Sequence, residues 1–228
     1  GTDVACFYAL KTLEQVINQY GKKLPSVSIN DYPDMSYRGF YYDASRGRIP
    51  SVEGIKRMVD ILAGMKINSL QVYVEHSFDF NEFRSLGRSS DYVLTPNDIL
   101  EIDDYCYQNF IDFIPSMATF GHLYELLSLN EYKELCELDN FKPEWHFWRE
   151  RMAHHTIDPS NPKSIKVICS LIDQYLPLFR SKYFNICCDE TFDLCTGKNK
   201  GKNKGNLYCE FVNKIIDHVT DNGKTVMM

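Results

Sequence analysis

The chain has 228 residues, of which 44% are hydrophobic and 25% are charged. These proportions are those of an ordinary globular protein and exclude disordered, collagen-like and coiled-coil chains. The formal net charge of −6 argues against a nucleic-acid-binding protein, which would normally present a basic face. The sequence predicts no membrane-spanning helix, because it contains no run of about 18 apolar residues, and no signal peptide is recognisable at its start.

Hydrophobic periodicity and capping residues predict the elements in chain order. Helices are expected at residues 8–20, 52–65, 96–109, 123–138, 164–179 and 207–219. Strands are expected at residues 38–43, 68–76, 111–117, 183–188 and 224–228. Ser51 and Thr95 are predicted N-caps. The alternation of strands and helices predicts a parallel sheet with helical crossovers.

Two further segments have open interpretations. Residues 197–205, GKNKGKNKG, indicate a solvated flexible loop, with electrostatic attraction of acidic glycans as the alternative. Trp145 and Trp148 in EWHFW indicate a turn of a core helix rather than a loop that stacks on sugars.

The eight cysteines do not indicate a disulfide framework, which a chain of this size does not need. Cys188, Cys195 and Cys209 also lack the spacing of a structural zinc site. We therefore expect a reducing, cytoplasmic environment and a protein without a metal or an organic cofactor.

Asp189 and Glu190 are the best candidates for catalysis. They follow the predicted strand YFNICC, and the carboxyl ends of parallel strands line the active sites of α/β folds. Neighbouring carboxylates repel each other, which favours protonation of one of them. A protonated Glu beside an ionised Asp is suited to acid-catalysed glycosidic cleavage. An acidic pair at a helix N-terminus explains the same residues equally well.

Polar residues also occur near the other predicted strands. Glu75 and His76 end one strand, and His122 follows the next, after a glycine that allows a tight turn. Arg38 lies in YRGFYYDASRGRIP together with Asp43. Its planar donor fork suits vicinal hydroxyl groups, but a structural ion pair is an equally good interpretation.

Four motifs together resemble a known family. In order they are FYALKTLEQV, YRGFYYDASRGRIPSVEGIKRMVDILAGMKINSLQVYVEHSF, TFGH and FNICCDETFDL. They resemble glycoside hydrolase family 20, the exo-β-N-acetylhexosaminidases. The stretch IPSMATFGHLYELLSLNEYKEL is most similar to the branch that includes hexosaminidase D.

The resemblance implies a (β/α)₈ barrel preceded by a small α+β domain. Residues 1–33 would be the tail of that domain, and residues 34–228 the barrel from its first strand to the start of its fifth. A complete barrel typically needs about 250 residues.

The resemblance also implies a retaining, substrate-assisted reaction on glycans that end in N-acetylglucosamine or N-acetylgalactosamine. Glu190 would be the general acid and then the base, and Asp189 would orient the 2-acetamido group. Arg38 would bind sugar hydroxyls, and His122 and Glu75 are expected to line the same pocket.

Two departures accompany the resemblance. Cys187 and Cys188 stand where relatives commonly have glycine before the Asp-Glu pair, and relatives continue beyond the strand that begins at KTVMM. The alternative function is therefore a truncated, catalytically incompetent fragment that binds a glycan or associates with itself through exposed barrel edges.

Overall fold

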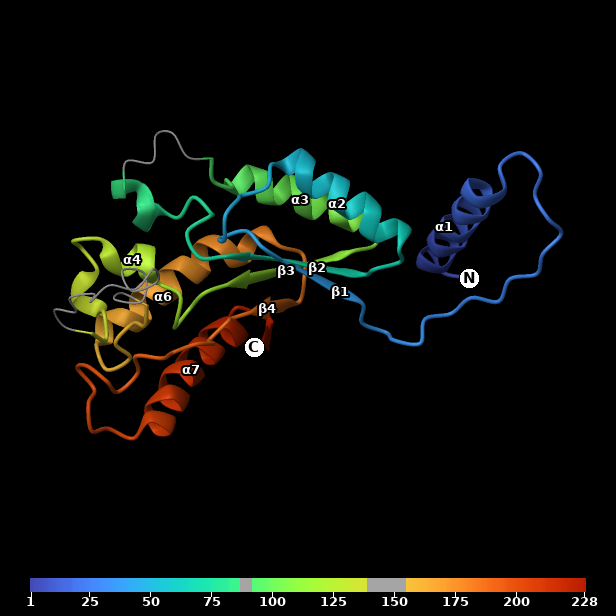
Figure 1. Ribbon diagram of the computed structural model, residues 1–228. Coiled ribbons are helices and arrows are strands. Elements are labelled where there is room, and N and C mark those ends of the chain that lie inside the picture. Colours follow the sequence, from blue (N-terminus) through green and yellow to red (C-terminus); the bar gives the residue numbers. More distant parts are fainter. Residues whose placement is uncertain (87–91, 139–154) are drawn as a thin grey trace.

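The computed structural model describes residues 1–86, 92–138 and 155–228. Its centre is a five-stranded parallel sheet in which the strands lie in chain order. These strands are β1 (Gly39–Asp43), β2 (Ser69–Val74), β3 (Asp112–Met117), β4 (Tyr183–Asn185) and β5 (Thr225–Met227). The predicted alternation of strands and helices is confirmed, because a helix lies in each connection (Figure 1).

The two helices with predicted N-caps begin directly after those caps, Ser51 and Thr95. The helices are α1 (Asp3–Tyr20), α2 (Val52–Gly64), α3 (Pro96–Gln108), α4 (Tyr124–Ser128), α6 (Pro162–Tyr175) and α7 (Lys204–Asp221). Short 3₁₀ segments are η1 (Asn81–Leu86), η2 (Lys133–Leu135) and η3 (Leu176–Leu178). Ser51 Oγ accepts a 3.2 Å hydrogen bond from Gly54 N, and Thr95 forms a reciprocal capping box with Asp98.

Several predicted elements differ in extent: α1 begins at Asp3 rather than at residue 8, and two further differences have a clear physical reason. The predicted helix over 123–138 breaks into α4 and η2, with extended backbone at Leu129 (ψ 140°) between them. Cys136 forms an isolated bridge with Ile157, so tertiary pairing overrides the helical periodicity. The predicted strand over 183–188 ends at Asn185, because Cys187 adopts a left-handed φ of 42° that a strand cannot accommodate.

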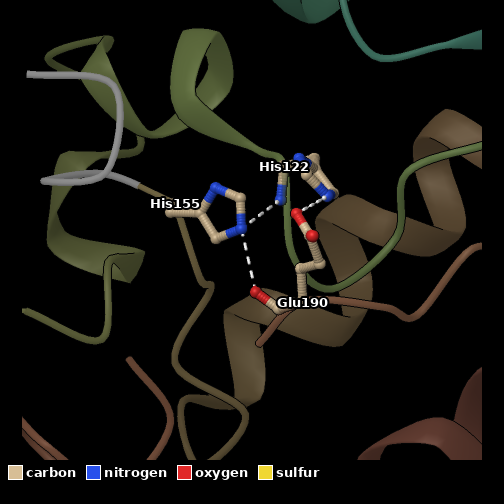
Figure 2. A group of neighbouring side chains, drawn as sticks. All are labelled: His122, His155 and Glu190. Carbon is tan, nitrogen blue, oxygen red and sulfur yellow. Dashed lines mark hydrogen bonds and ion pairs between the residues drawn. The ribbon is translucent and has the colours of Figure 1, made fainter. Parts of the chain in front are cut away.

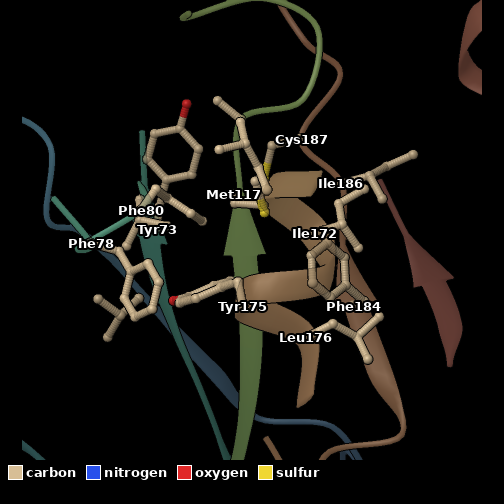
Figure 3. Close-up of a cluster of buried hydrophobic side chains, with 14 of the residues drawn as sticks. Tyr73, Phe78, Phe80, Met117, Ile172, Tyr175, Leu176, Phe184, Ile186 and Cys187 are labelled. Atoms are coloured by element: carbon tan, nitrogen blue, oxygen red, sulfur yellow. The ribbon is translucent and has the colours of Figure 1, made fainter. Parts of the chain in front are cut away.

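The two faces of the sheet differ in chemistry. Apolar strand residues such as Leu70, Val72 and Phe184 are fully buried against the helices. Figure 3 shows Tyr175 of α6 in the same buried cluster as Phe184 and Phe78, and its ring centroid lies 4.9 Å from that of Phe78. The opposite face carries hydrogen-bonded polar pairs, such as Tyr41 Oη with Ser116 Oγ at 3.1 Å. At the carboxyl ends of the strands, this polar face borders the candidate site.

Helix α1 lies apart from the rest, at one end of the molecule (Figure 1). None of its residues is buried, and it reaches α2 through a 2.7 Å hydrogen bond from Gln15 Nε2 to Gly64 O. A groove of about 1090 Å³ separates α1 from residues 24–35 and is lined mostly by apolar side chains. The apolar face of α1 is therefore largely uncovered.

Within the three described ranges, no helix is both long and apolar enough to cross a membrane. All eight cysteines fall within these ranges, and each is a free thiol.

Candidate active site

Polar side chains meet at one end of the sheet, where four neighbouring strands reach their carboxyl ends. They come from the last residue of β1 and from the loops after β1, β2, β3 and β4, and are Asp43, Arg46, Glu75, His122, Asp189 and Glu190. Four of the five site residues predicted from the sequence are therefore brought together: Glu75, His122, Asp189 and Glu190.

His122 stands behind the two acids that follow β4. Its Nε2 lies 3.0 Å from Glu190 Oε2 and 3.6 Å from Asp189 Oδ2. The imidazole is 8% exposed, whereas the side chains of Glu190 and Asp189 are 51% and 63% exposed. Hydrogen bonding to His122 lowers the pKa of Asp189 despite its partial burial. Glu190 and the ionised Asp189 therefore face solvent, and the buried imidazole of His122 contacts both from behind.

Glu75 and Arg46 contact the other side of the imidazole. Glu75 Oε1 lies 3.5 Å from His122 Nδ1, and its side chain is 3% exposed. Arg46 Nη1 lies 2.8 Å from the same Glu75 oxygen, and Arg46 Nη2 lies 2.9 Å from His122 Nδ1. Tyr73 Oη donates a 3.1 Å hydrogen bond to Glu75 Oε1. This buried carboxylate is therefore paired and hydrogen-bonded, as a charge in a protein interior must be.

His155 is a site residue that sequence reasoning did not select. Its Nε2 lies 2.9 Å from the backbone oxygen of Glu190, and its ring packs edge-on against His122 with 4.5 Å between centroids (Figure 2). It also stacks on Phe192 at 5.8 Å, and it is 2% exposed. His155 follows no strand, so the rule that selected the other residues does not apply to it.

The backbone around the acids is strained and closely packed. His122 and Glu190 have left-handed φ values of 58° and 52°. Gly121 is required for a different reason: a Cβ there would lie 2.5 Å from the backbone oxygen of Asp189. The sequence indicated a tight turn at this glycine, whereas the structure shows close approach of two loops. Strained conformations of this kind concentrate at functional sites.

Comparison with known families decides the identity of this site. Residues 35–228 match the family described as glycosyl hydrolase family 20, catalytic domain. The chain belongs to glycosyl hydrolase family 20. The resemblance stated from the four sequence motifs is thereby confirmed.

Curated relatives and a solved structure of family 20 agree with this assignment. The chain is 28% identical over 209 residues to a beta-hexosaminidase of Porphyromonas gingivalis, covering 81% of this chain and 26% of the relative. It is 25% identical to human hexosaminidase D, covering 67% of this chain and 29% of the relative. The structure of a Flavobacterium johnsoniae chitobiase aligns with a TM-score of 0.79 and 26% identity, covering 96% of this chain and 35% of that one.

These comparisons confirm the predicted fold class, a partial (β/α)₈ barrel of family 20. The chain spans between about a quarter and a third of the length of these relatives.

The fifth predicted residue of the family 20 site, Arg38, lies at the opposite end of β1. Its Nε donates a 2.7 Å hydrogen bond to Lys66 O, and one Nη donates to Met35 O at 2.7 Å. Its other Nη lies 3.3 Å from Tyr8 Oη of α1. In this chain Arg38 therefore joins β1 to the N-terminal segment, and its role toward a sugar remains a prediction.

The family 20 chain also brings together three groups that are able to ligate a metal. One atom each from His122, His155 and Glu190 lies within 4.8 Å of the others. Figure 2 shows both Nε2 atoms directed at oxygens of Glu190, one in its side chain and one in its backbone. His155 Nε2 already contacts two main-chain groups, the oxygen of Glu190 at 2.9 Å and the N–H of His122 at 3.4 Å. The arrangement therefore favours a hydrogen-bonded acid over a metal centre.

Before the Asp-Glu pair, where the family 20 pattern commonly has glycine, this chain has Cys187. It adopts a left-handed φ of 42°, the conformation that glycine tolerates best. Its Sγ lies 3.1 Å from Ser116 Oγ, and its N–H donates to Asn185 Oδ1 at 3.2 Å. Burial raises the pKa of the thiol to about 11, so this cysteine is protonated at neutral pH. Trp145 and Trp148 lie outside the described residues.

Proposed function

We propose that this family 20 chain carries the acid-base machinery of a retaining exo-β-N-acetylhexosaminidase. One observation supports this most directly: Glu190 is exposed at the end of β4 and is held by a buried His122 that is itself held by Glu75. A carboxyl group that is accessible to a substrate, but fixed from behind, is suited to donating a proton to a glycosidic oxygen.

In the proposed reaction, the carbonyl oxygen of the substrate's 2-acetamido group attacks C1 while Glu190 donates its proton to the glycosidic oxygen. The C1–O bond breaks, the aglycone leaves as an alcohol, and an oxazolinium ion forms. Ionised Glu190 then takes a proton from the water that attacks C1, which opens the ring with net retention. Two adjacent carboxylates suit this scheme, because the nucleophile belongs to the substrate.

Asp189 is proposed to orient the acetamido group. A carboxylate accepts a hydrogen bond from the acetamido N–H and stabilises the positive charge that develops on the oxazolinium ion. The lowered pKa of Asp189 supports this role, because it keeps the group ionised while Glu190 acts as an acid. Asp189 is also exposed, as a group that contacts substrate must be.

His122 and Glu75 are proposed to orient Glu190. Both side chains are at least nine-tenths buried and lie behind the acids that face solvent. The sequence suggested that they contact the sugar directly, and that more specific role remains a prediction.

Hydrolysis of chromogenic β-N-acetylglucosaminides tests the proposal. Glu190→Gln is expected to lower kcat about 100-fold or more on a 4-nitrophenyl substrate, because general acid catalysis contributes on that order. The loss should be smaller on a 2,4-dinitrophenyl substrate, whose leaving group needs less protonation. Asp189→Asn should slow both substrates alike.

Glu210→Gln, which replaces an exposed acid of α7, is the matched control and should be unchanged. Unchanged turnover in Glu190→Gln would exclude Glu190 as the general acid. Equal turnover of plain β-glucosides that lack the acetamido group would contradict the substrate-assisted mechanism.

Glycan binding without turnover is the second candidate, favoured by how open the site is. Glu190 and Asp189 are more than half exposed, and Tyr41 of β1 is 48% exposed. Saturable binding of N-acetylglucosamine by calorimetry, with no hydrolysis over hours, would select this candidate.

A further inference from the structure

Arg46 contacts both His122 and Glu75, the carboxylate behind it, through one charged group. Its Nη1 lies 2.8 Å from Glu75 Oε1 and 2.9 Å from Asp43 Oδ2. Its Nη2 lies 2.9 Å from His122 Nδ1. The guanidinium also lies over the ring of Tyr73, 5.9 Å from its centroid. These contacts fix the fork of Arg46 in one plane beside the imidazole.

The contact between Arg46 and His122 has a chemical direction. A guanidinium has five N–H donors and no acceptor, so Arg46 Nη2 can only donate. His122 Nδ1 must therefore accept, and it cannot carry a hydrogen. In a neutral imidazole the hydrogen is then on Nε2, which faces Glu190 Oε2 at 3.0 Å.

Without Arg46, the same surroundings would favour a different state of His122. Glu75 Oε1 lies 3.5 Å from Nδ1, and a carboxylate at that distance draws a hydrogen onto the nitrogen it faces. His122 would then become an imidazolium, or it would turn Nε2 into an acceptor. Either state changes the acid, because Glu190 would face a cation or lose its hydrogen-bond donor.

We propose that Arg46 is a positioning residue that holds His122 as the neutral Nε2–H tautomer. Glu190 Oε2 then always accepts a hydrogen bond, and the transferable proton is carried by the other oxygen of Glu190. The tautomer assignment stands on these contacts alone, whereas its consequence for proton donation rests on the proposed function.

Several other charged or titratable groups lie around Arg46 and His122 and influence the protonation of the imidazole. Tyr73, Glu75 and His76 belong to β2 and the loop after it. The others are Asp43 at the end of β1, Asp189 in the loop after β4, and His155 in the segment before α6. Arg46 Nη2 donates to His122 Nδ1 at 2.9 Å, so Arg46 is the group that keeps hydrogen off this nitrogen.

Nitrogen NMR of the 228-residue chain with labelled histidine tests the assignment without any need for activity. The His122 resonances are identified by their loss in His122→Gln. We expect Nδ1 to be unprotonated and Nε2 protonated in the unmodified chain at neutral pH. In Arg46→Met we expect hydrogen on Nδ1.

Arg48→Met is the matched control, because Arg48 is exposed in the same loop. Hydrogen on Nδ1 in the unmodified chain, or an unchanged His122 spectrum in Arg46→Met, would overturn the proposal.

Arg46→Lys keeps the test decisive if Arg46→Met does not fold. Lysine preserves a cation beside Glu75 and Asp43, but its ammonium ends one bond short of the Nη atoms, so it cannot also reach Nδ1. We expect a folded protein in which Nδ1 still gains hydrogen. A folded Arg46→Lys chain whose His122 keeps the original tautomer would equally overturn the proposal.

Kinetic measurements distinguish a positioning role of Arg46 from a role in overall stability. If the unmodified chain hydrolyses 4-nitrophenyl β-N-acetylglucosaminide, Arg46→Met should lower kcat/KM at least about tenfold, and the basic limb of the pH profile should move, because Glu190 would then face a cation or lose its hydrogen-bond donor. The loss should shrink on the dinitrophenyl substrate. Equal losses on both substrates with an unchanged pH profile would contradict positioning. If the unmodified chain is inactive, the proposed function fails, and the NMR result alone decides the role of Arg46.

Discussion

Three residues of the site hold left-handed backbone conformations that side chains other than glycine rarely adopt. Cys187, Glu190 and His122 have φ values between 42° and 58°, and each such residue costs about 1 to 3 kcal/mol. Local contacts fix two of them: Asn185 accepts from Cys187 N, and His155 holds the backbone oxygen of Glu190. The direction of the Glu190 side chain is therefore set by its main chain as well as by His122.

Asp193, three residues after Glu190, makes stability depend on pH. Its Oδ2 is buried and has no hydrogen-bond partner within the described ranges, and burial raises the pKa of the carboxyl to about 6. The folded state thus favours the protonated form. That contribution is complete below about pH 4 and is lost as the pH rises through 6.

Asp193→Asn should remove this dependence, because an amide carries no charge at any of these pH values. Relative to the unmodified chain, the variant should gain about 2 kcal/mol in unfolding free energy between pH 4 and pH 7. Urea denaturation at the two pH values measures the difference. Asp217→Asn, at an exposed position of α7, is the control and should show no such gain. A gain that is equal at both pH values would contradict the pKa argument.

Sequence reasoning found those site residues that directly follow strands. Asp189, Glu190, Glu75 and His122 were selected because parallel strand ends converge, and that rule depends only on the order of elements. Arg46 lies in the loop after β1, so the same rule could have selected it, whereas His155 follows no strand and no periodicity marks it. The placement of Arg38 beside Tyr8 likewise depends on how α1 meets the sheet.

At the scale of elements, local signals decided some boundaries and tertiary contacts decided others. The capping residues of α2 and α3 fixed their first residues, because a cap is a local hydrogen bond. The segment after α4 has helical spacing of leucines as well, yet it folds back to pair with the chain around Ile157. Its apolar residues are buried by that pairing rather than by a helix face.

The lysine loop, residues 197–205, differs from the solvated flexible loop that its composition predicts. The expected flexible loop is instead anchored around Asn199, which is 1% exposed. Asn199 Nδ2 donates to Glu137 Oε2 at 2.5 Å and to Asp158 Oδ1 at 2.6 Å. Gly197 passes so close to Glu137 that a Cβ would lie 2.1 Å from its backbone oxygen. Gly197 and Asn199 therefore serve packing, which composition alone does not reveal, whereas Gly201 and Asn203 are exposed.

Replacing Asn199 should destabilise the protein strongly. Asn199→Ala leaves the buried carboxylates of Glu137 and Asp158 without the amide that satisfies both, which should cost about 3 kcal/mol or more. Lys200→Ala, at the exposed neighbouring position, should change stability by less than about 0.5 kcal/mol. Thermal or urea unfolding compares the two. Equal effects of the two substitutions on stability would contradict this packing role and favour a solvated loop.

At the scale of the whole molecule, the described sheet is open. Among the described residues, β1 pairs only with β2 and β5 only with β4, so both outer strands present unpaired edges. Phe40 and Tyr41 of β1 are 41% and 48% exposed. Leu10 and Leu13 add an apolar patch on α1, at 59% and 46% exposure. Unpaired edges and apolar patches of this kind are templates for association.

The 228-residue chain is therefore expected to self-associate at micromolar concentration. Sedimentation velocity over a tenfold concentration series should show dimers or larger species. Phe40→Lys and Leu13→Glu then locate the contact, because a charge on an edge strand blocks sheet pairing whereas a charge on α1 disrupts apolar packing. A shift toward monomer in Phe40→Lys alone would assign the interface to the β1 edge, and a shift in Leu13→Glu alone would assign it to α1. A monomer throughout the series would show that the open sheet is tolerated in solution and would contradict the prediction.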